Sequence, residues 1–115
     1  MTLTIKHKFP DYNTFIRSGG KYAMHQIAQT TVDMVSWECK AQKIRPVKAA
    51  HISFKWIEKN RLRDKDNIAF AKKFILDGLQ RAGVLTNDGW NQILSLHDEF
   101  ETGKEYGVIV TIREV

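Results

Sequence analysis

Apolar and polar positions alternate in several short stretches of the chain. They alternate over residues 2–9, and Pro10 follows, so the pattern predicts a half-exposed strand that ends there. The same signal predicts three further strands, over 49–57, 93–100 and 107–113. The segment Thr102-Gly103-Lys104 lies between the last two strands, and its turn residues predict that they form a hairpin.

Two longer segments carry apolar residues at steps of three and four, which is typical of helices packed on a core. The first is expected over residues 21–43 and stops before Arg45-Pro46, because the residue before a proline resists the helical conformation. The second is expected over 67–82 and is followed by Gly83, a common residue at helix ends. Its apolar stripe consists of Ile68, Ala71, Ile75, Leu79 and Ala82.

The resulting order, strand–helix–strand–helix–strand–strand, predicts an α+β fold in which two main helices pack on a small mixed sheet of about four strands. The chain has 115 residues and contains no repeat or linker, so residues 1–115 are expected to form a single domain.

The composition narrows the classes of partner. The formal net charge is +5, which favours an anionic partner such as nucleic acid. Cys39 is the only cysteine and falls in the first helical pattern, so we expect a buried thiol and neither a disulfide nor a cysteine zinc site. Charged residues interrupt every apolar stretch, which predicts a cytoplasmic protein without membrane span or signal peptide.

The most informative segment is the charged run from Arg61 to Asn67. Asp64 and Asp66 are two positions apart, so in extended backbone both carboxylates point to one side and can share a metal ion. An EF-hand is excluded, because Ala69 and Ile75 stand where its loop requires glycine and glutamate. The alternative is structural, since aspartate before a helix is a good N-cap.

Projection of an unbroken helix from Asp66 places Phe70, Lys73 and Asp77 on one stripe and Lys72 off it. Lys73 is therefore the cation expected to approach whatever Asp66 binds. The alternative is that Lys73 and Asp77 form an ordinary surface pair four residues apart.

A further acid lies in the turn after this helix. Asn87-Asp88-Gly89 is favoured turn sequence, so Asp88 has a structural explanation as well as a possible role in the site. Sequence alone does not place Asp88 within reach of Asp64.

Together these residues resemble the RusA family of Holliday-junction resolvases, metal-dependent endonucleases of phage and prophage origin. The family pattern is Asp-x-Asp-Asn, a helix with a lysine, Asp-x-Leu, a short apolar turn and an acidic pair. In this chain it is matched by Asp64-Lys65-Asp66-Asn67, Lys73, Asp77-Gly78-Leu79, Gly83-Val84-Leu85 and Asn87-Asp88, with Phe9, Pro10 and Asn13 as a looser N-terminal extension.

The chain departs from this pattern in two places. The gap between Asn67 and the lysine is about three residues longer than in well-known members, which leaves open whether Lys72 or Lys73 is the equivalent residue. Asn87 stands where the family often has the first aspartate of its pair.

The resemblance implies a homodimer that resolves four-way DNA junctions by paired nicks in recombination and repair. It implies that Asp64, Asp66 and Asp88 are catalytic and bind Mg²⁺, with Mn²⁺ as a substitute, and that Lys73 is the catalytic lysine. The residues expected to contact DNA are Arg61, Arg63, Lys65, Asn13 and Lys72, and those expected to support the site are Asn67, Asp77 and Asn87. His97 and Glu99 are open candidates.

Two alternatives remain at this stage. One is a module with the same fold that binds branched DNA without cutting it. The other is an ordinary interaction protein in which Asp66 only caps a helix, and in which Trp37, Trp56 and Trp90 build the core or an interface.

Overall fold

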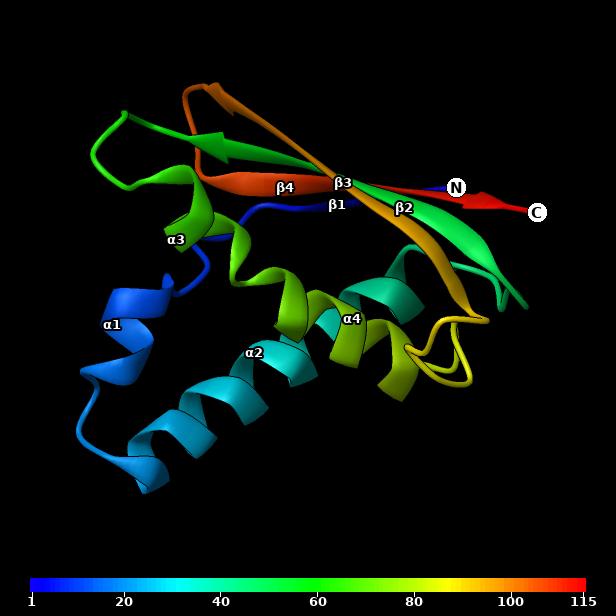
Figure 1. Cartoon of the computed structure of the whole chain (residues 1–115), viewed down its shortest axis with the longest axis horizontal. Helices are drawn as coiled ribbons and strands as arrows, with labels where there is room; N and C mark the ends of the chain where they lie inside the picture. The colour runs from blue at the N-terminus through cyan, green and yellow to red at the C-terminus, as the bar shows by residue number, and fades with distance from the viewer.

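A computed structural model describes all residues from 1 to 115, and its elements occur in an α+β order. The strands are β1 (Thr2–Ile5), β2 (Ala50–Glu58), β3 (Ile93–Thr102) and β4 (Gly107–Glu114), and the helices are α1 (Tyr12–Ile16), α2 (Lys21–Ala41), α3 (Lys65–Ala69) and α4 (Lys72–Arg81). The helices all lie on one side of the sheet, whose other face stays open (Figure 1). The expected α+β fold is confirmed.

The sheet has the strand order β1-β4-β2-β3. β2 pairs with β3 in parallel and with β4 antiparallel, and β4 pairs antiparallel with β1. Parallel neighbours need a crossover connection, which α3 and α4 supply across the covered face.

The predicted hairpin between 93–100 and 107–113 is therefore wrong, because β2 lies between these two strands. Their connection passes across the end of β2 instead, where the Gly103 N–H donates to the Glu58 carbonyl at 2.8 Å. Local turn residues do not distinguish a hairpin from a connection that spans one intervening strand, because both need a sharp turn.

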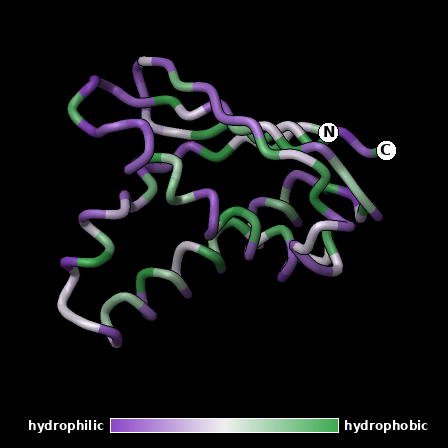
Figure 2. The backbone as a smooth tube through the Cα atoms, in the orientation of Figure 1, coloured by the Kyte–Doolittle hydropathy of each residue, from purple (hydrophilic) through white to green (hydrophobic).

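Alternation in the strands builds the core as expected. On β2, Ile52, Phe54 and Trp56 are at most 1% exposed and face the helices. They belong to one cluster of buried apolar side chains that draws on the sheet, α2 and α4. In Figure 2 the strands carry much of the hydrophobic colour, whereas the connection from β2 to α3 is mainly hydrophilic. Cys39 is buried as predicted, and burial raises the pKa of its thiol to about 11.

Two elements differ from the sequence expectation at the N-terminal end. The first strand stops at Ile5, although Phe9 is buried, and a short helix, α1, forms where only a turn was expected. Asp11 is its N-cap, because its carboxylate accepts a hydrogen bond from the Thr14 N–H at 2.7 Å.

The helix expected over 67–82 is broken into α3 and α4 at Phe70 and Ala71. At the break, the N–H groups of Ala71, Lys73 and Phe74 bond to carbonyls three residues back, which is the tighter 3₁₀ pattern. The unbroken projection from Asp66 to Asp77 therefore does not hold.

An aromatic cluster surrounds this break. The Phe70 ring centroid lies 5.2 Å from that of Tyr12, 5.3 Å from that of Phe15 and 5.5 Å from that of Phe74. Such pairs stabilise a packing beyond the area they bury. The cluster therefore packs α1 against the junction of α3 and α4.

The tightest helix contact lies at Gly78 of α4. A Cβ built on this glycine would meet the Cβ of Val35 on α2 at 2.5 Å, so α2 and α4 approach as closely as a residue without a side chain permits.

We expect Gly78→Ala to destabilise the protein by about 1–3 kcal/mol, because the added methyl overpacks a buried contact and outweighs the gain in helix propensity. Urea unfolding measures the loss. Gln80→Ala, at an exposed position of the same helix, is the matched control and should change stability little. Equal stabilities of the two variants would contradict this account of the helix packing.

Candidate functional site

The candidate site is built around Arg63, a half-buried arginine in the loop between β2 and α3. Arg63 donates through Nε and Nη2 to the two carboxylate oxygens of Glu58, at 2.8 and 2.7 Å. Its Nη1 donates to the Phe9 carbonyl at 2.8 Å and lies 3.4 Å from the Asp11 carboxylate. Arg63 therefore ties the end of β2 to the N-terminal segment and to the cap of α1.

The titration of this group agrees with the geometry. The hydrogen bonds to Glu58 raise the pKa of Arg63 above its ordinary value. Burial tends to raise the pKa of Asp11, but the hydrogen bonds from Thr14 and Arg63 outweigh it, so that pKa is lowered overall. Both groups stay charged at neutral pH.

These contacts correct the expectation that Arg63 binds DNA. Its side chain is only 14% exposed and its charge is already matched by two carboxylates. The signal that could have indicated this is Glu58, an acid at the end of a strand whose alternation makes the position buried.

The contacts of Arg63 hold the chain in place just before α3, where Asp64 and Asp66 lie. Asp64, not Asp66, is the N-cap residue of α3, and its side chain makes no capping hydrogen bond. The Asp66 carboxylate accepts only from the N–H of Asn67, at 2.9 Å. Both side chains are exposed and neither forms an ion pair, so the capping role does not account for them.

The two aspartates share a small hollow with α1. It has a volume of about 300 Å³ and is lined by Tyr12, Asn13, Asp64, Asp66, Asn67 and Phe70. The Asn13 N–H donates to Oδ1 of Asn67 at 2.9 Å, which holds α1 against α3. The structure thus brings Asn13 and Asn67, which are far apart in sequence, to the predicted aspartate pair.

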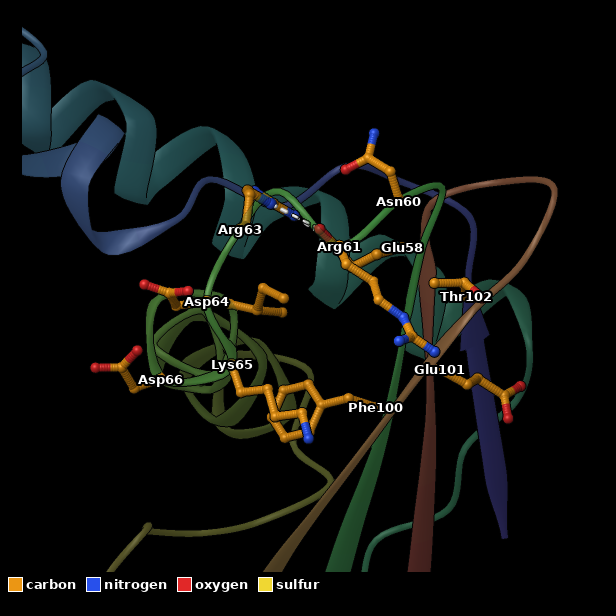
Figure 3. Close-up of a pocket in the computed structure, with 11 residues that line it drawn as sticks. Glu58, Asn60, Arg61, Arg63, Asp64, Lys65, Asp66, Phe100, Glu101 and Thr102 are labelled. Carbon is orange, nitrogen blue, oxygen red and sulfur yellow. Dashed lines mark hydrogen bonds and ion pairs between the residues drawn. The ribbon is translucent and has the colours of Figure 1, made fainter.

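A larger cavity of about 570 Å³ opens on the other side of Asp64 and Asp66. It lies between the start of α3 and the ends of β2 and β3, and its lining consists of Glu58, Asn60, Arg61, Arg63, Asp64, Lys65, Asp66, Ile68, Phe100, Glu101 and Thr102. In Figure 3 the Arg61 side chain extends toward Glu101, whereas the Asp64 and Asp66 carboxylates lie together on the far side of α3. The Lys65 ammonium lies over the Phe100 ring, 5.8 Å from its centroid.

Arg61 and Lys65 form no ion pair, so two exposed cations line the cavity, across α3 from the two exposed carboxylates (Figure 3). The sequence alone did not predict that residues of β3 line this cavity. Phe100, Glu101 and Thr102 reach the site because β2 and β3 end together in parallel, a pairing that the sequence pattern did not indicate.

The two candidate lysines on α4 lie elsewhere. Lys73 is 63% exposed and pairs with Asp77 at 3.3 Å, which is the surface pair considered as the alternative. Asp77 faces a hollow beside α2 with Gln80 and Arg81. Lys72 is held by Asp98, which also accepts from Nε1 of Trp56 at 2.9 Å. Neither lysine lines the cavities at Asp64 and Asp66.

Asp88 is not brought to Asp64 and Asp66 within the chain. It lies in the loop before β3, whereas Asp64 follows the end of β2, and the two strands run in parallel. The eight residue steps from Ala50 to Glu58 correspond to about 26 Å. Figure 1 shows this loop and α3 at opposite ends of the sheet.

Asn87 closes the turn at this end, where its Oδ1 accepts from the Asp88 N–H at 2.8 Å. No group of three or more His, Cys, Asp and Glu side chains in the chain is placed to hold a metal ion. His97 and Glu99 form an exposed pair at 3.5 Å on β3 and do not line the site.

Two comparisons with known proteins were negative. No protein-family model matches this chain, and no curated protein matches it. No helix reaches the length and hydropathy that crossing a membrane would require.

We expect Arg63→Met to destabilise the protein by about 3–5 kcal/mol, because it leaves the buried Glu58 carboxylate without its partner. Arg61→Met removes the same charge from an exposed position two residues away and should change stability by less than about 0.5 kcal/mol. Denaturant unfolding of both variants checks the difference. A loss of DNA binding without a loss of stability in Arg63→Met would restore the original assignment.

Proposed function

We propose that this protein is a metal-dependent endonuclease of the RusA type, which cuts the backbone of branched DNA such as a four-way junction. The observation that carries the proposal is the pair of neighbouring, exposed carboxylates on Asp64 and Asp66, which form no ion pair, together with the unpaired cations of Arg61 and Lys65 in the adjoining cavity. Unneutralised acids beside unneutralised bases suit a cation and a phosphate bound together.

The donor set fits Mg²⁺. This ion takes one or two protein carboxylates and fills its remaining positions with water and substrate phosphate oxygens. Asp64 and Asp66 would hold it, and Mn²⁺ accepts the same ligands. When bound, the ion would polarise the phosphodiester and lower the pKa of a water molecule that attacks it.

The chain itself would position the phosphate. Arg61 and Lys65 lie on the cavity beside the aspartates, and in this proposal they offset the negative charge that builds up on the phosphate during cleavage. The Phe100 ring beneath Lys65 restricts its ammonium group. These two residues replace Lys73 in the role of the stabilising cation, because Lys73 is paired with Asp77.

A homodimer would give Asp88 a place in this site. β3 is an edge strand of ten residues whose outer side has no partner, and its Leu94 and Leu96 are exposed. At the opposite edge, Gln42 bonds to both the N–H and the carbonyl of Thr4 and so covers β1. The free edge is therefore the one available for pairing.

If β3 paired antiparallel with β3 of a second copy, the two strands would run in opposite directions along the shared edge. The loop that carries Asp88 in one copy would then lie at the end of the sheet where Asp64 and Asp66 lie in the other. We infer that Asp88 completes the site across the dimer.

A second candidate is a module that binds branched DNA without cutting it. It is favoured by the absence of a third metal-ligating side chain near Asp64 and Asp66 within one chain. Such a module would still use Arg61 and Lys65 to contact phosphates.

We expect purified wild-type protein with Mg²⁺ to nick a synthetic four-way junction, and Asp66→Asn to lower the rate by at least about 100-fold, because the variant loses one charge that holds the ion. Gel electrophoresis of labelled strands measures the rate. Asp77→Asn, a loss of the same charge on α4, is the control and should cut normally. Binding without cutting under Mg²⁺ and Mn²⁺ would select the second candidate.

A mixing experiment tests the shared site. We expect Asp64→Asn and Asp88→Asn to be inactive alone and to regain activity when their subunits are exchanged, because each mixed dimer contains one intact site. Random exchange would restore about a quarter of the wild-type nicking rate. No recovery from subunits shown to exchange would place Asp88 outside the active site or within its own subunit's site.

A further inference from the structure

A second group of cations gathers around one tyrosine at the same end of the sheet. The Lys8 ammonium lies 4.8 Å from the centroid of the Tyr106 ring and the Lys59 ammonium lies 5.7 Å from it. The buried Arg63 guanidinium lies 5.8 Å from the same centroid. Three separate chain segments, after β1, after β2 and before β4, therefore converge on this ring.

The charges in this group are not balanced. Arg63 is neutralised by Glu58 and Asp11, and the nearby Lys6 pairs with Glu105 at 3.6 Å. Lys8 and Lys59 are exposed and form no ion pair. Two unpaired like charges held near one ring repel each other, so the arrangement gains stability when an anion binds beside them.

The tyrosine ring restricts these lysines. A cation over an aromatic face is attracted by the ring quadrupole, which limits the positions of an otherwise flexible side chain. Tyr106 is half-buried, and its hydroxyl donates no hydrogen bond within the protein. The ring is therefore placed to restrict both Lys8 and Lys59.

The loop after β2 connects this cluster to the candidate active site. Lys59 faces Tyr106, and Arg61, two residues later, lines the cavity beside Asp64 and Asp66. Asn60 stiffens the loop between them, since its Oδ1 accepts from the Leu62 N–H at 3.0 Å. Unpaired cations thus continue from the cavity beside the aspartates along one short segment to the start of β4.

We propose that Lys8, Lys59 and Tyr106 form a subsite for the phosphate backbone of DNA that extends away from the cleaved bond. The proposal rests on the proposed function, because it identifies the anion through its continuity with that site. Contacts of this kind position a strand without reading its sequence and make binding sensitive to salt.

The test is fluorescence anisotropy with a labelled four-way junction at several salt concentrations, without divalent metal so that no cleavage occurs. We expect Lys8→Gln and Lys59→Gln each to lower the slope of log affinity against log salt by about 1. Lys48→Gln removes the same charge from an exposed site before the start of β2, at the other end of the sheet, and should leave the slope unchanged.

The role of the ring is tested separately. Tyr106→Leu should weaken junction binding by about two- to fivefold while both lysines remain, because the cation–π attraction is lost. Tyr106→Phe keeps the ring face and should bind like the wild type. Thermal unfolding of each variant excludes loss of the fold as the cause.

The outcomes separate this inference from the proposed function. If the wild type nicks the junction while the Lys8 and Lys59 variants bind like Lys48→Gln, the subsite is overturned and the nuclease stands. If the wild type neither binds nor nicks the junction, both fail. Tighter binding of an RNA duplex, or of anionic vesicles, than of the junction would also overturn DNA as the ligand.

Discussion

The buried guanidinium of Arg63 is the interaction on which the candidate site depends. It joins Glu58 at the end of β2 to Phe9 and Asp11, which lie 54 and 52 residues before Arg63 in the chain. Leaving one member of such a group unpaired in the interior is costly, so these contacts hold the loop after β2 in place. The path of this loop sets where Asp64 begins α3. Arg63, which the sequence suggests as a DNA contact, thus has a structural role in setting the geometry of the site.

The break between α3 and α4 has a similar influence. A continuous helix from Asp66 would have carried Lys73 and Asp77 along the same stripe as that aspartate, whereas the break at Phe70 and Ala71 interrupts the stripe. The aromatic cluster at the break packs α1 beside α3, and Asn67 secures it by accepting from Asn13. The break therefore leaves Lys73 away from both cavities that the aspartates line.

The topology of the sheet explains the remaining arrangement. Because β3 runs parallel to β2, their ends converge beside α3, and the residues before β3 lie at the far end of the sheet. This separates Asp88 from Asp64 in one chain and leaves β3 as a long free edge. The antiparallel pairing of β4 with β2 brings Tyr106, before the start of β4, to the same end of the sheet as Lys59 and the aspartates. The candidate site is therefore formed by several loops, which lie close in space because their strands begin or end at the same end of the sheet.

The sequence by itself determined the features that depend on local periodicity and on residue chemistry. Alternation on β2 and the helical spacing of α2 placed Trp56 and Cys39 in the core, and the unusual density of charge located Asp64 and Asp66 as chemical candidates. Only the tertiary structure decided which strands pair, that Arg63 is buried, and that Asp88 lies apart. Those outcomes depend on contacts between distant residues, where burial of one charge or the crossover of one strand outweighs any local preference.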